Sequence, residues 1–215
     1  MTRETHTLIV PDGVRFIAMG AVLTGISHLA MNVQTTTFFG LLTCFCIWFF
    51  RDPHRNVPSG EKLIVSPADG VVVEIVKFYE DKFIEGPALR VSIFLNVFNV
   101  HVNRIPVEGE IVGIAYNPGR FLAANVPKAS LENEQNKLLI QTPWGKRVIL
   151  IQIAGLIARR IVCWSKKGTK MNCGERFGMI RFGSRVDLII PAGTALRVEV
   201  GNKVVGGETI LGELK

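Results

Sequence analysis

The feature that most constrains the fold is a charge-free region near the N-terminus. Between Phe16 and Phe50 the sequence contains no aspartate, glutamate, lysine or arginine. Two apolar stretches, residues 16–31 and 38–50, flank a polar link at residues 32–37. Each stretch is shorter than the ~20 residues that a straight transmembrane helix needs. The pattern predicts a membrane hairpin of two tilted helices or a re-entrant or interfacial anchor. A pair of soluble core helices is the third alternative.

The net charge lies in the rest of the chain. The sequence holds 25 basic and 18 acidic residues, of which residues 1–50 contain two of each kind, so the net charge of +7 belongs to residues 51–215. Basic residues flank the apolar region at Arg15 before it and at Arg51 and Arg55 after it. By the positive-inside rule both ends of the anchor face the cytoplasm, where anionic lipid would attract a basic body. We therefore expect the protein at the cytoplasmic face of the cell membrane, and we expect no nucleic-acid partner.

The body of the chain is patterned as β-strands. Residues 51–61, with two prolines and a glycine, predict an extended linker. Beyond it, apolar runs flank the turn at residues 67–70, and two further strands flank residues 143–145. The tail, residues 188–214, repeats the order of strand, turn and strand, with Pro-Ala-Gly where the first turn has Pro-Ala-Asp-Gly. It resembles the hammerhead half of biotinyl and lipoyl carrier domains without their modified lysine.

These patterns predict a mainly β (α+β) protein with three parts. We expect a hydrophobic helical membrane anchor at residues 1–50 and the linker at residues 51–61. We expect a barrel-sandwich hybrid with hammerhead-like repeats at residues 62–215. The four cysteines, Cys44, Cys46, Cys163 and Cys173, have no C-x-x-C or zinc spacing, so we expect free thiols and no metal site.

A glycine–serine pair, Gly183 and Ser184, interrupts a strand-like run in "GERFGMIRFGSRVDLIIP". Such pairs are usually turns. The alternative is that the chain cuts itself there, because glycine tolerates strained dihedral angles that expose its carbonyl to the neighbouring hydroxyl. If a base removes the hydroxyl proton, the acyl group can move from nitrogen to oxygen. Elimination then leaves a dehydroalanine, which hydrolyses to a pyruvoyl group at the new N-terminus.

Two further residues are candidates for the acid–base chemistry. His101 is predicted to lie within a body strand, where alternation puts it on the same face as Asn103. Its side chain is a natural proton carrier, although an isolated buried histidine is often only structural. Asp69 lies in the turn at residues 67–70, where aspartate is ordinary turn chemistry. If the fold brings Asp69 to His101, the two would form an orienting pair for Ser184.

Six segments, in this order along the chain, carry a resemblance to a known family: "FFRDPHR", "VSPADGVVVEI", "HVNRIPVEG", "YNPGRFLAANVPKASLENEQN", "IQIAGLIARRIV" and "GERFGMIRFGSRVDLIIP". From about Phe49 to the C-terminus the sequence resembles the short type of phosphatidylserine decarboxylase, a pyruvoyl-dependent enzyme of phospholipid synthesis. The resemblance implies self-cleavage between Gly183 and Ser184 into chains 1–183 and 184–215, with Ser184 becoming the covalent pyruvoyl cofactor.

The resemblance also assigns roles to other residues. Asp69 and His101 match the aspartate and histidine of the family. Longer relatives have a second histidine three residues after the first, and Arg104 occupies that position here. How His101 and Arg104 divide maturation and turnover is therefore open.

The implied reaction begins with a Schiff base between the substrate amine and the pyruvoyl group, which accepts the electrons released on loss of carbon dioxide. His101 would then return a proton, and hydrolysis would release phosphatidylethanolamine without a metal. Arginines are suited to phosphate, and Arg159, Arg160 and Arg176 are the candidates here.

The expected partners are phosphatidylserine, membrane lipid and the two chains of the cleaved precursor, and a homo-oligomer is open. Two alternatives remain. The same chemistry could act on a serine headgroup carried by an ether lipid. The chain could also be a membrane-anchored barrel-sandwich adaptor without chemistry.

Overall fold

The structure is a computed structural model, and it describes residues 8–119, 133–155, 160–181 and 184–215. The chain forms two compact units, Met1–His54 and Arg55–Lys215. The division between them falls inside the predicted linker.

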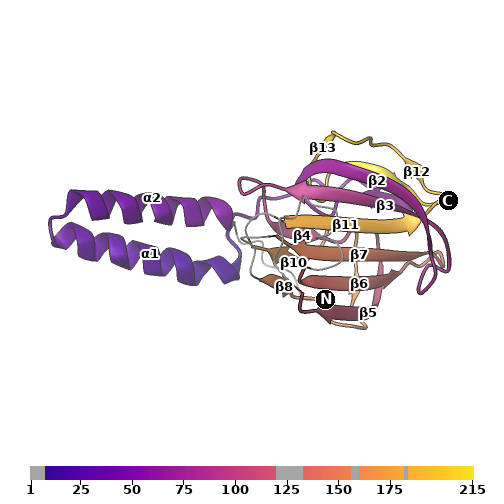
Figure 1. Ribbon diagram of the computed structural model, residues 1–215, viewed down its shortest axis with the longest axis horizontal. Helices are drawn as coiled ribbons and strands as arrows, with labels where there is room; N and C mark the ends of the chain where they lie inside the picture. Colours follow the sequence, from indigo (N-terminus) through magenta and orange to yellow (C-terminus); the bar gives the residue numbers. More distant parts are fainter. Residues whose placement is uncertain (1–7, 120–132, 156–159, 182–183) are drawn as a thin grey trace. The chain divides into compact units, whose positions relative to one another are not determined.

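The first unit is a hairpin of two helices, α1 (Pro11–Leu29) and α2 (Val33–Phe49) (Figure 1). Both helices are longer than predicted, and most of the expected polar link belongs to α2. Asn32 caps this helix, because its side chain accepts a hydrogen bond from the backbone N–H of Thr35 (3.1 Å). The hydroxyl of Thr36 donates to the carbonyl of Asn32 (2.7 Å), a local bond that lets threonine sit inside a helix.

The two helices approach closely through glycine. A Cβ atom at Gly20 would lie only 2.5 Å from Thr43 Oγ1, so a larger residue there would push the helices apart. Their other sides carry exposed apolar side chains, among them Ile26, Phe38 and Leu41. In the part of the chain that the structure describes, neither helix is long and apolar enough to cross a membrane.

The second unit is built from strands, so the predicted mainly β class is confirmed. β-Branched and aromatic residues fill the long strands, as the pleated and half-buried surface of a sheet favours. The strands are β1 (Leu63–Val65), β2 (Gly70–Glu80), β3 (Gly86–Leu95), β4 (Val102–Arg104), β5 (Gly109–Asn117), β6 (Gln135–Gln141), β7 (Arg147–Ala154), β8 (Ile161–Cys163), β9 (Lys170–Met171), β10 (Arg176–Ile180), β11 (Ser184–Pro191), β12 (Ala195–Leu196), β13 (Lys203–Val204) and β14 (Ile210–Glu213).

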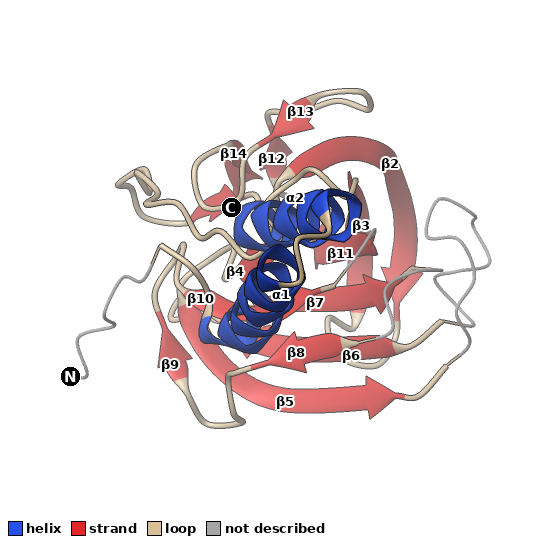
Figure 2. Cartoon of the chain, turned by 90° about the vertical axis from the view of Figure 1, so that its left-hand side faces the viewer, coloured by secondary structure: helices blue, strands red, loops and turns tan. Residues whose placement is uncertain are grey.

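Eight of these strands form one antiparallel sheet in the order β13-β2-β3-β11-β7-β6-β5-β9. The sheet is strongly curled: Figure 2 shows β2 bending over on one side while β5 lies at the other. Two small sheets, β1-β14-β12 and β4-β10-β8, complete the unit. The main core contains residues of all three sheets, including Ile64, Val186 and Phe177, so it fills the space that the curled sheet and the small sheets enclose.

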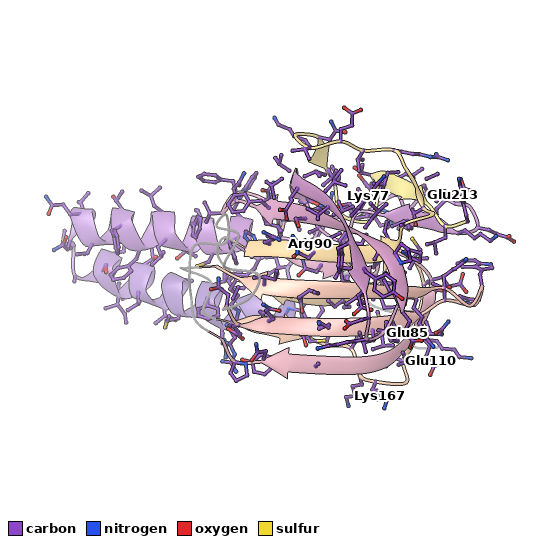
Figure 3. The ribbon with its side chains drawn as sticks, turned by 45° about the vertical axis from the view of Figure 1, so that its right-hand side comes forward. Lys77, Glu85, Arg90, Glu110, Lys167 and Glu213 are labelled. Atoms are coloured by element: carbon purple, nitrogen blue, oxygen red, sulfur yellow. The ribbon has the colours of Figure 1, made fainter. Side chains whose placement is uncertain are left out.

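Alternation along β11 separates the two faces of the large sheet. Val186 and Leu188 belong to the main core, whereas Ile189 belongs to a second apolar cluster on the other face. On that other face Arg185 and Asp187 form a buried ion pair, with Nε and Oδ1 2.6 Å apart. Many of the remaining charges lie at the surface of the unit, as the labelled side chains in Figure 3 illustrate.

Candidate active site

Ser184 is the first residue of β11, a central strand of the curled sheet. It pairs with Leu95 of β3 on one side and with Ala154 of β7 on the other, and both neighbours belong to the main core. The side chain of Ser184 therefore points to the inner face, and the residue is fully buried. Its hydroxyl makes no hydrogen bond within the described residues. Gly183, the other half of the predicted cleavage bond, lies outside the described residues.

Asn133 and Glu134 fix the end of β7 that lies beside Ser184. Asn133 Nδ2 donates to the carbonyl oxygen of Ala154 (2.7 Å), and the backbone N–H of Ala154 donates to the carbonyl of Glu134 (3.0 Å). The Glu134 carboxylate in turn accepts a hydrogen bond from the Tyr116 hydroxyl (2.9 Å). This bond, together with burial, raises the pKa of Tyr116 and keeps the donor protonated.

His101 lies immediately before β4 rather than within a strand, which corrects the prediction by one residue. It is fully buried. Its carbonyl accepts a hydrogen bond from the backbone N–H of Ile180 (3.3 Å), the last residue of β10 and only four positions before Ser184. The histidine is therefore packed against the strand that leads into the predicted cleavage bond.

A side-chain hydrogen bond joins the His101 region to the sheet that carries Ser184. Gln152 Nε2 of β7 donates to Asn103 Oδ1 of β4 (2.8 Å). Gln152 lies opposite Val186, two pairs along the strands from the Ser184–Ala154 pair and on the same face of the sheet, and Asn103 is two residues from His101. The bond holds β4 against the inner face of the large sheet, so the chain segments that bear His101 and Ser184 converge.

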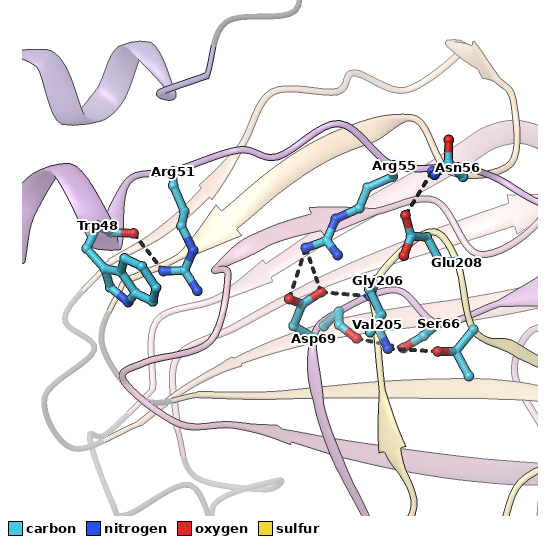
Figure 4. Close-up of polar contacts among 11 residues, drawn as sticks. Trp48, Arg51, Arg55, Asn56, Ser66, Asp69, Val205, Gly206 and Glu208 are labelled. Atoms are coloured by element: carbon cyan, nitrogen blue, oxygen red, sulfur yellow. Dashed lines mark hydrogen bonds and ion pairs between the residues drawn. The ribbon is translucent and has the colours of Figure 1, made fainter.

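Asp69 has different partners from the one predicted. In the described part of the chain its carboxylate is bonded to Arg55 Nη2 (2.9 and 3.0 Å) and to the backbone N–H of Gly206 (2.8 Å), rather than to His101 (Figure 4). Arg55 comes from the linker and Gly206 from the tail, and both side chains of the ion pair are largely buried. The turn that carries Asp69 is thus held from two sides by distant parts of the sequence.

Arg104 lies close to the same turn. It is almost fully buried, and its backbone N–H donates to the carbonyl of Pro67 (2.8 Å). Its guanidinium donates through Nη1 to the carbonyl of Gly174 (3.1 Å). A Cβ atom at Gly207, where φ is +80°, would lie 2.9 Å from Arg104 Cδ, so the arginine stem occupies the space that this glycine leaves.

Two of the three predicted phosphate-binding arginines, Arg160 and Arg176, lie in the part of the chain that the structure describes. Arg159 lies outside the described residues. Arg160 is exposed, and its carbonyl accepts a hydrogen bond from the backbone N–H of Arg181 (3.3 Å). Arg176 opens β10, is half-buried and pairs in register with Arg104. Within the described residues, no hydrogen bond joins Arg160 to Arg176.

Three buried amides were not predicted from the sequence to take part in the site: Asn103, Gln152 and Asn136. Asn136 Nδ2 donates to Gln152 Oε1 (2.9 Å), which extends the bridge described above to β6. The sequence signal that could have revealed them is a polar residue at an inward-facing strand position. Gln152 lies on the same face of β7 as Leu150 and Ala154, and both of these belong to the core. A buried polar group at such a position needs a specific partner.

Together these residues can supply a protected nucleophile and a proton carrier. Ser184 offers a water-excluded hydroxyl, His101 a buried imidazole on the adjoining segment, and Asp69 a carboxylate with a fixed orientation. This set suits acyl transfer at the bond before Ser184, the chemistry that serine performs when a base takes its proton.

Comparison with known proteins identifies the family of this chain. The family described as phosphatidylserine decarboxylase matches residues 42–212. A protein of Syntrophus aciditrophicus named phosphatidylserine decarboxylase proenzyme is 48% identical over 207 residues, which cover 96% of this chain and 97% of the relative. Proteins of the same name from Desulfotalea psychrophila and Geotalea uraniireducens are 48% and 44% identical, and the alignments cover 96% and 99% of both chains in each pair. The chain therefore belongs to the phosphatidylserine decarboxylase family.

Proposed function

We propose that this chain decarboxylates phosphatidylserine to phosphatidylethanolamine with a pyruvoyl group that it makes from Ser184 by cutting the bond after Gly183. The observation that carries the proposal is the state of Ser184, a fully buried hydroxyl without a hydrogen bond in the described structure. Family membership supports the substrate and the reaction. The word proenzyme in the names of the relatives supports a processing step.

Self-cleavage requires only the chain and one water molecule. Ser184 Oγ attacks the carbonyl carbon of Gly183, and the acyl group passes from nitrogen to oxygen while the hydroxyl proton ends on the freed amine. Removal of the Ser184 Cα proton then expels the carboxylate of residue 183 from Cβ and leaves dehydroalanine. Water adds to the imine tautomer of dehydroalanine, and ammonia leaves. The new N-terminus is a pyruvoyl group, and no oxidant is needed.

The surroundings of Ser184 fit such a group. A methyl ketone carries no N–H or O–H, and its neighbours Leu95 and Ala154 are apolar. When formed, the pyruvoyl group supplies an electron sink for the charge left on loss of carbon dioxide.

His101 is our candidate to return a proton to the substrate carbon. Asp69, oriented by Arg55 and Gly206, is our candidate to support the proton transfers of maturation. In the part of the chain that the structure describes, Asp69 and His101 share no hydrogen bond, so a direct role of Asp69 in these transfers requires a rearrangement before cleavage. Arg104, packed beside the Asp69 turn, is expected to share the work of the second histidine of longer relatives. Arg159, Arg160 and Arg176 are the proposed contacts to the lipid phosphate.

We further propose that the helical hairpin anchors the enzyme at the cytoplasmic face of the cell membrane. The exposed apolar side chains of α1 and α2 support this proposal, as does the basic character of the remainder of the chain. The enzyme would then meet its substrate at the bilayer surface. For the second unit we propose the finer fold assignment, a barrel-sandwich hybrid with hammerhead-like repeats.

Decarboxylation of vesicle-bound substrate tests the function. Wild-type protein mixed with vesicles that contain phosphatidylserine labelled at the serine carboxyl should release labelled carbon dioxide and accumulate phosphatidylethanolamine. Ser184→Ala should release none, because it cannot form the ketone. The proposal is wrong if fully cleaved wild-type protein releases no carbon dioxide, or if the Ser184→Ala protein is as active as the wild type.

A further inference from the structure

Three buried carboxamides form a chain with a single direction. Asn136 Nδ2 donates to Gln152 Oε1 (2.9 Å), and Gln152 Nε2 donates to Asn103 Oδ1 (2.8 Å). All three residues are at most 3% exposed. Asn136 and Gln152 each donate one side-chain N–H to the carbonyl oxygen of the next amide. The Nδ2 group of Asn103 is therefore the last group in this series of hydrogen bonds.

The Nδ2 group of Asn103 has unused hydrogen-bond donors. Asn103 Nδ2 is buried and has no hydrogen-bond acceptor among the described residues, although an amide nitrogen carries two N–H donors. Buried donors in folded proteins are nearly always paired. A buried and unpaired donor with a fixed orientation therefore points to an acceptor that a ligand brings.

The position of Asn103 indicates which ligand. It is held to Gln152, whose flanking residues Leu150 and Ala154 mark the inner face of β7. Gln152 is a diagonal neighbour of Ser184 across the β7–β11 pair, a relation that puts side chains about 7–8 Å apart. Along its own segment Asn103 is two residues from His101. The unpaired donor thus belongs to the same junction of β4, β7 and β11 as the proposed reacting groups.

We propose that the Asn103 carboxamide binds the carboxylate of the serine headgroup, and that Gln152 and Asn136 are positioning residues that keep its N–H groups turned toward the substrate. This inference rests on the function proposed above. A carboxylate only accepts hydrogen bonds and so matches a group that only donates. A neutral amide also orients the carboxylate without neutralising it. A lysine or arginine would instead stabilise a negative charge that the substrate must give up as carbon dioxide.

The product provides the test, because phosphatidylethanolamine keeps the phosphate and the amine but lacks the carboxylate. Asn103→Asp replaces the donor with an oxygen that repels the substrate carboxylate. Gln152→Glu removes the donor to Asn103 Oδ1, so that Asn103 turns its N–H groups toward residue 152 and presents its carbonyl to the substrate. Gln141→Glu makes the same chemical change at the far end of β6, where the side chain bonds the carbonyl of Lys146, and serves as the control.

Three quantities are measured on each full-length protein: cleavage between residues 183 and 184, kcat/KM for phosphatidylserine in mixed micelles, and inhibition by phosphatidylethanolamine. For Asn103→Asp and Gln152→Glu we expect complete cleavage and a loss of roughly ten- to a hundredfold in kcat/KM, the range for a hydrogen bond to a charged group. Inhibition by the product should change by less than about twofold, and Gln141→Glu should stay within about twofold of the wild type in all three measurements.

Three results would each overturn the inference. The first is an unchanged kcat/KM in both variants. The second is a parallel loss of product inhibition, which would mean that Asn103 contacts the phosphate or only supports the fold. The third is a loss of cleavage, which would make Asn103 a residue of maturation. Failure of the wild-type protein to decarboxylate is a separate result that removes the proposed function itself.

Discussion

At the scale of single residues, His101 combines complete burial with a position on the segment that contacts β10 just before Ser184. We expect His101→Ala to fail at cleavage, at turnover or at both, with a rate loss of roughly 10²–10⁴ in the affected step, the range for general acid–base catalysis. Intact mass after timed incubation reports cleavage, and kcat of any cleaved protein reports turnover. Normal cleavage with full activity would remove His101 from the mechanism.

The Arg55–Asp69 pair offers a second prediction at this scale. Its side chains are 9% and 16% exposed, so Arg55→Ala leaves a mostly buried carboxylate without its charged partner. We expect a loss of about 3 kcal/mol of folding free energy, as for other broken buried pairs, and slower self-cleavage.

The matched control is Arg197→Ala, which breaks an ion pair whose side chains are 52% and 47% exposed. It should cost less than about 1 kcal/mol. Each substitution is combined with Ser184→Ala, so that the chain stays uncleaved. Urea unfolding of the two double variants then compares the two losses of stability directly. Equal losses would show that the Asp69 turn does not depend on Arg55.

The buried thiol of Cys173 makes the free energy of unfolding depend on pH in the alkaline range. Burial raises the pKa of its thiol from 9.0 to about 11, so the folded state holds the proton more tightly than the unfolded state does. The associated stability is complete below pH 9 and is lost as pH rises toward 11, because the unfolded thiol ionises first. Thermal unfolding at pH 8 and pH 10.5 should show a smaller alkaline loss for Cys173→Ala than for the wild type. An identical loss in both proteins would contradict this assignment.

At the scale of elements, β11 begins at Ser184 and is paired along both edges, with β3 and with β7. Cutting the bond before Ser184 leaves all of these pairings intact. We therefore expect chains 1–183 and 184–215 to co-elute in size-exclusion chromatography in native buffer and to separate only in denaturant. Release of the small chain in native buffer would mean that the sheet does not hold β11 as described.

The sequence predicts those elements whose signals are local. The turn at residues 67–70 separates β1 from β2, and the turn at residues 143–145 separates β6 from β7, as expected from their proline and glycine residues. The polar chain through Gln152 could not be predicted in this way. It depends on a hydrogen bond between β4 and the inner face of β7, whose residues lie far apart in the sequence. Likewise, the sequence suggests His101 as the partner of Asp69, whereas the fold brings Arg55 and Gly206 to the Asp69 carboxylate.

At the scale of the whole molecule, we propose that the hairpin attaches the protein to the membrane and that the second unit carries out the chemistry. Phe38 and Val22 are exposed apolar residues of α2 and α1. Replacing both with lysine should reduce flotation with phosphatidylserine vesicles by at least about tenfold, because each loses roughly 1.5–3 kcal/mol of apolar burial. Self-cleavage should be unchanged, since neither residue belongs to the second unit. Undiminished flotation would contradict the assignment of the hairpin as the anchor.

The proposed conversion of Ser184 to a ketone cuts the polypeptide and changes its mass, so the intact mass of the purified protein decides whether the conversion occurs. We predict that the 23.8 kDa chain is replaced by two fragments, residues 1–183 and 184–215. The smaller one should be lighter than the unmodified peptide by one ammonia and should gain two hydrogens on borohydride reduction. An active protein recovered as a single uncut chain with an intact serine at position 184 would contradict the account.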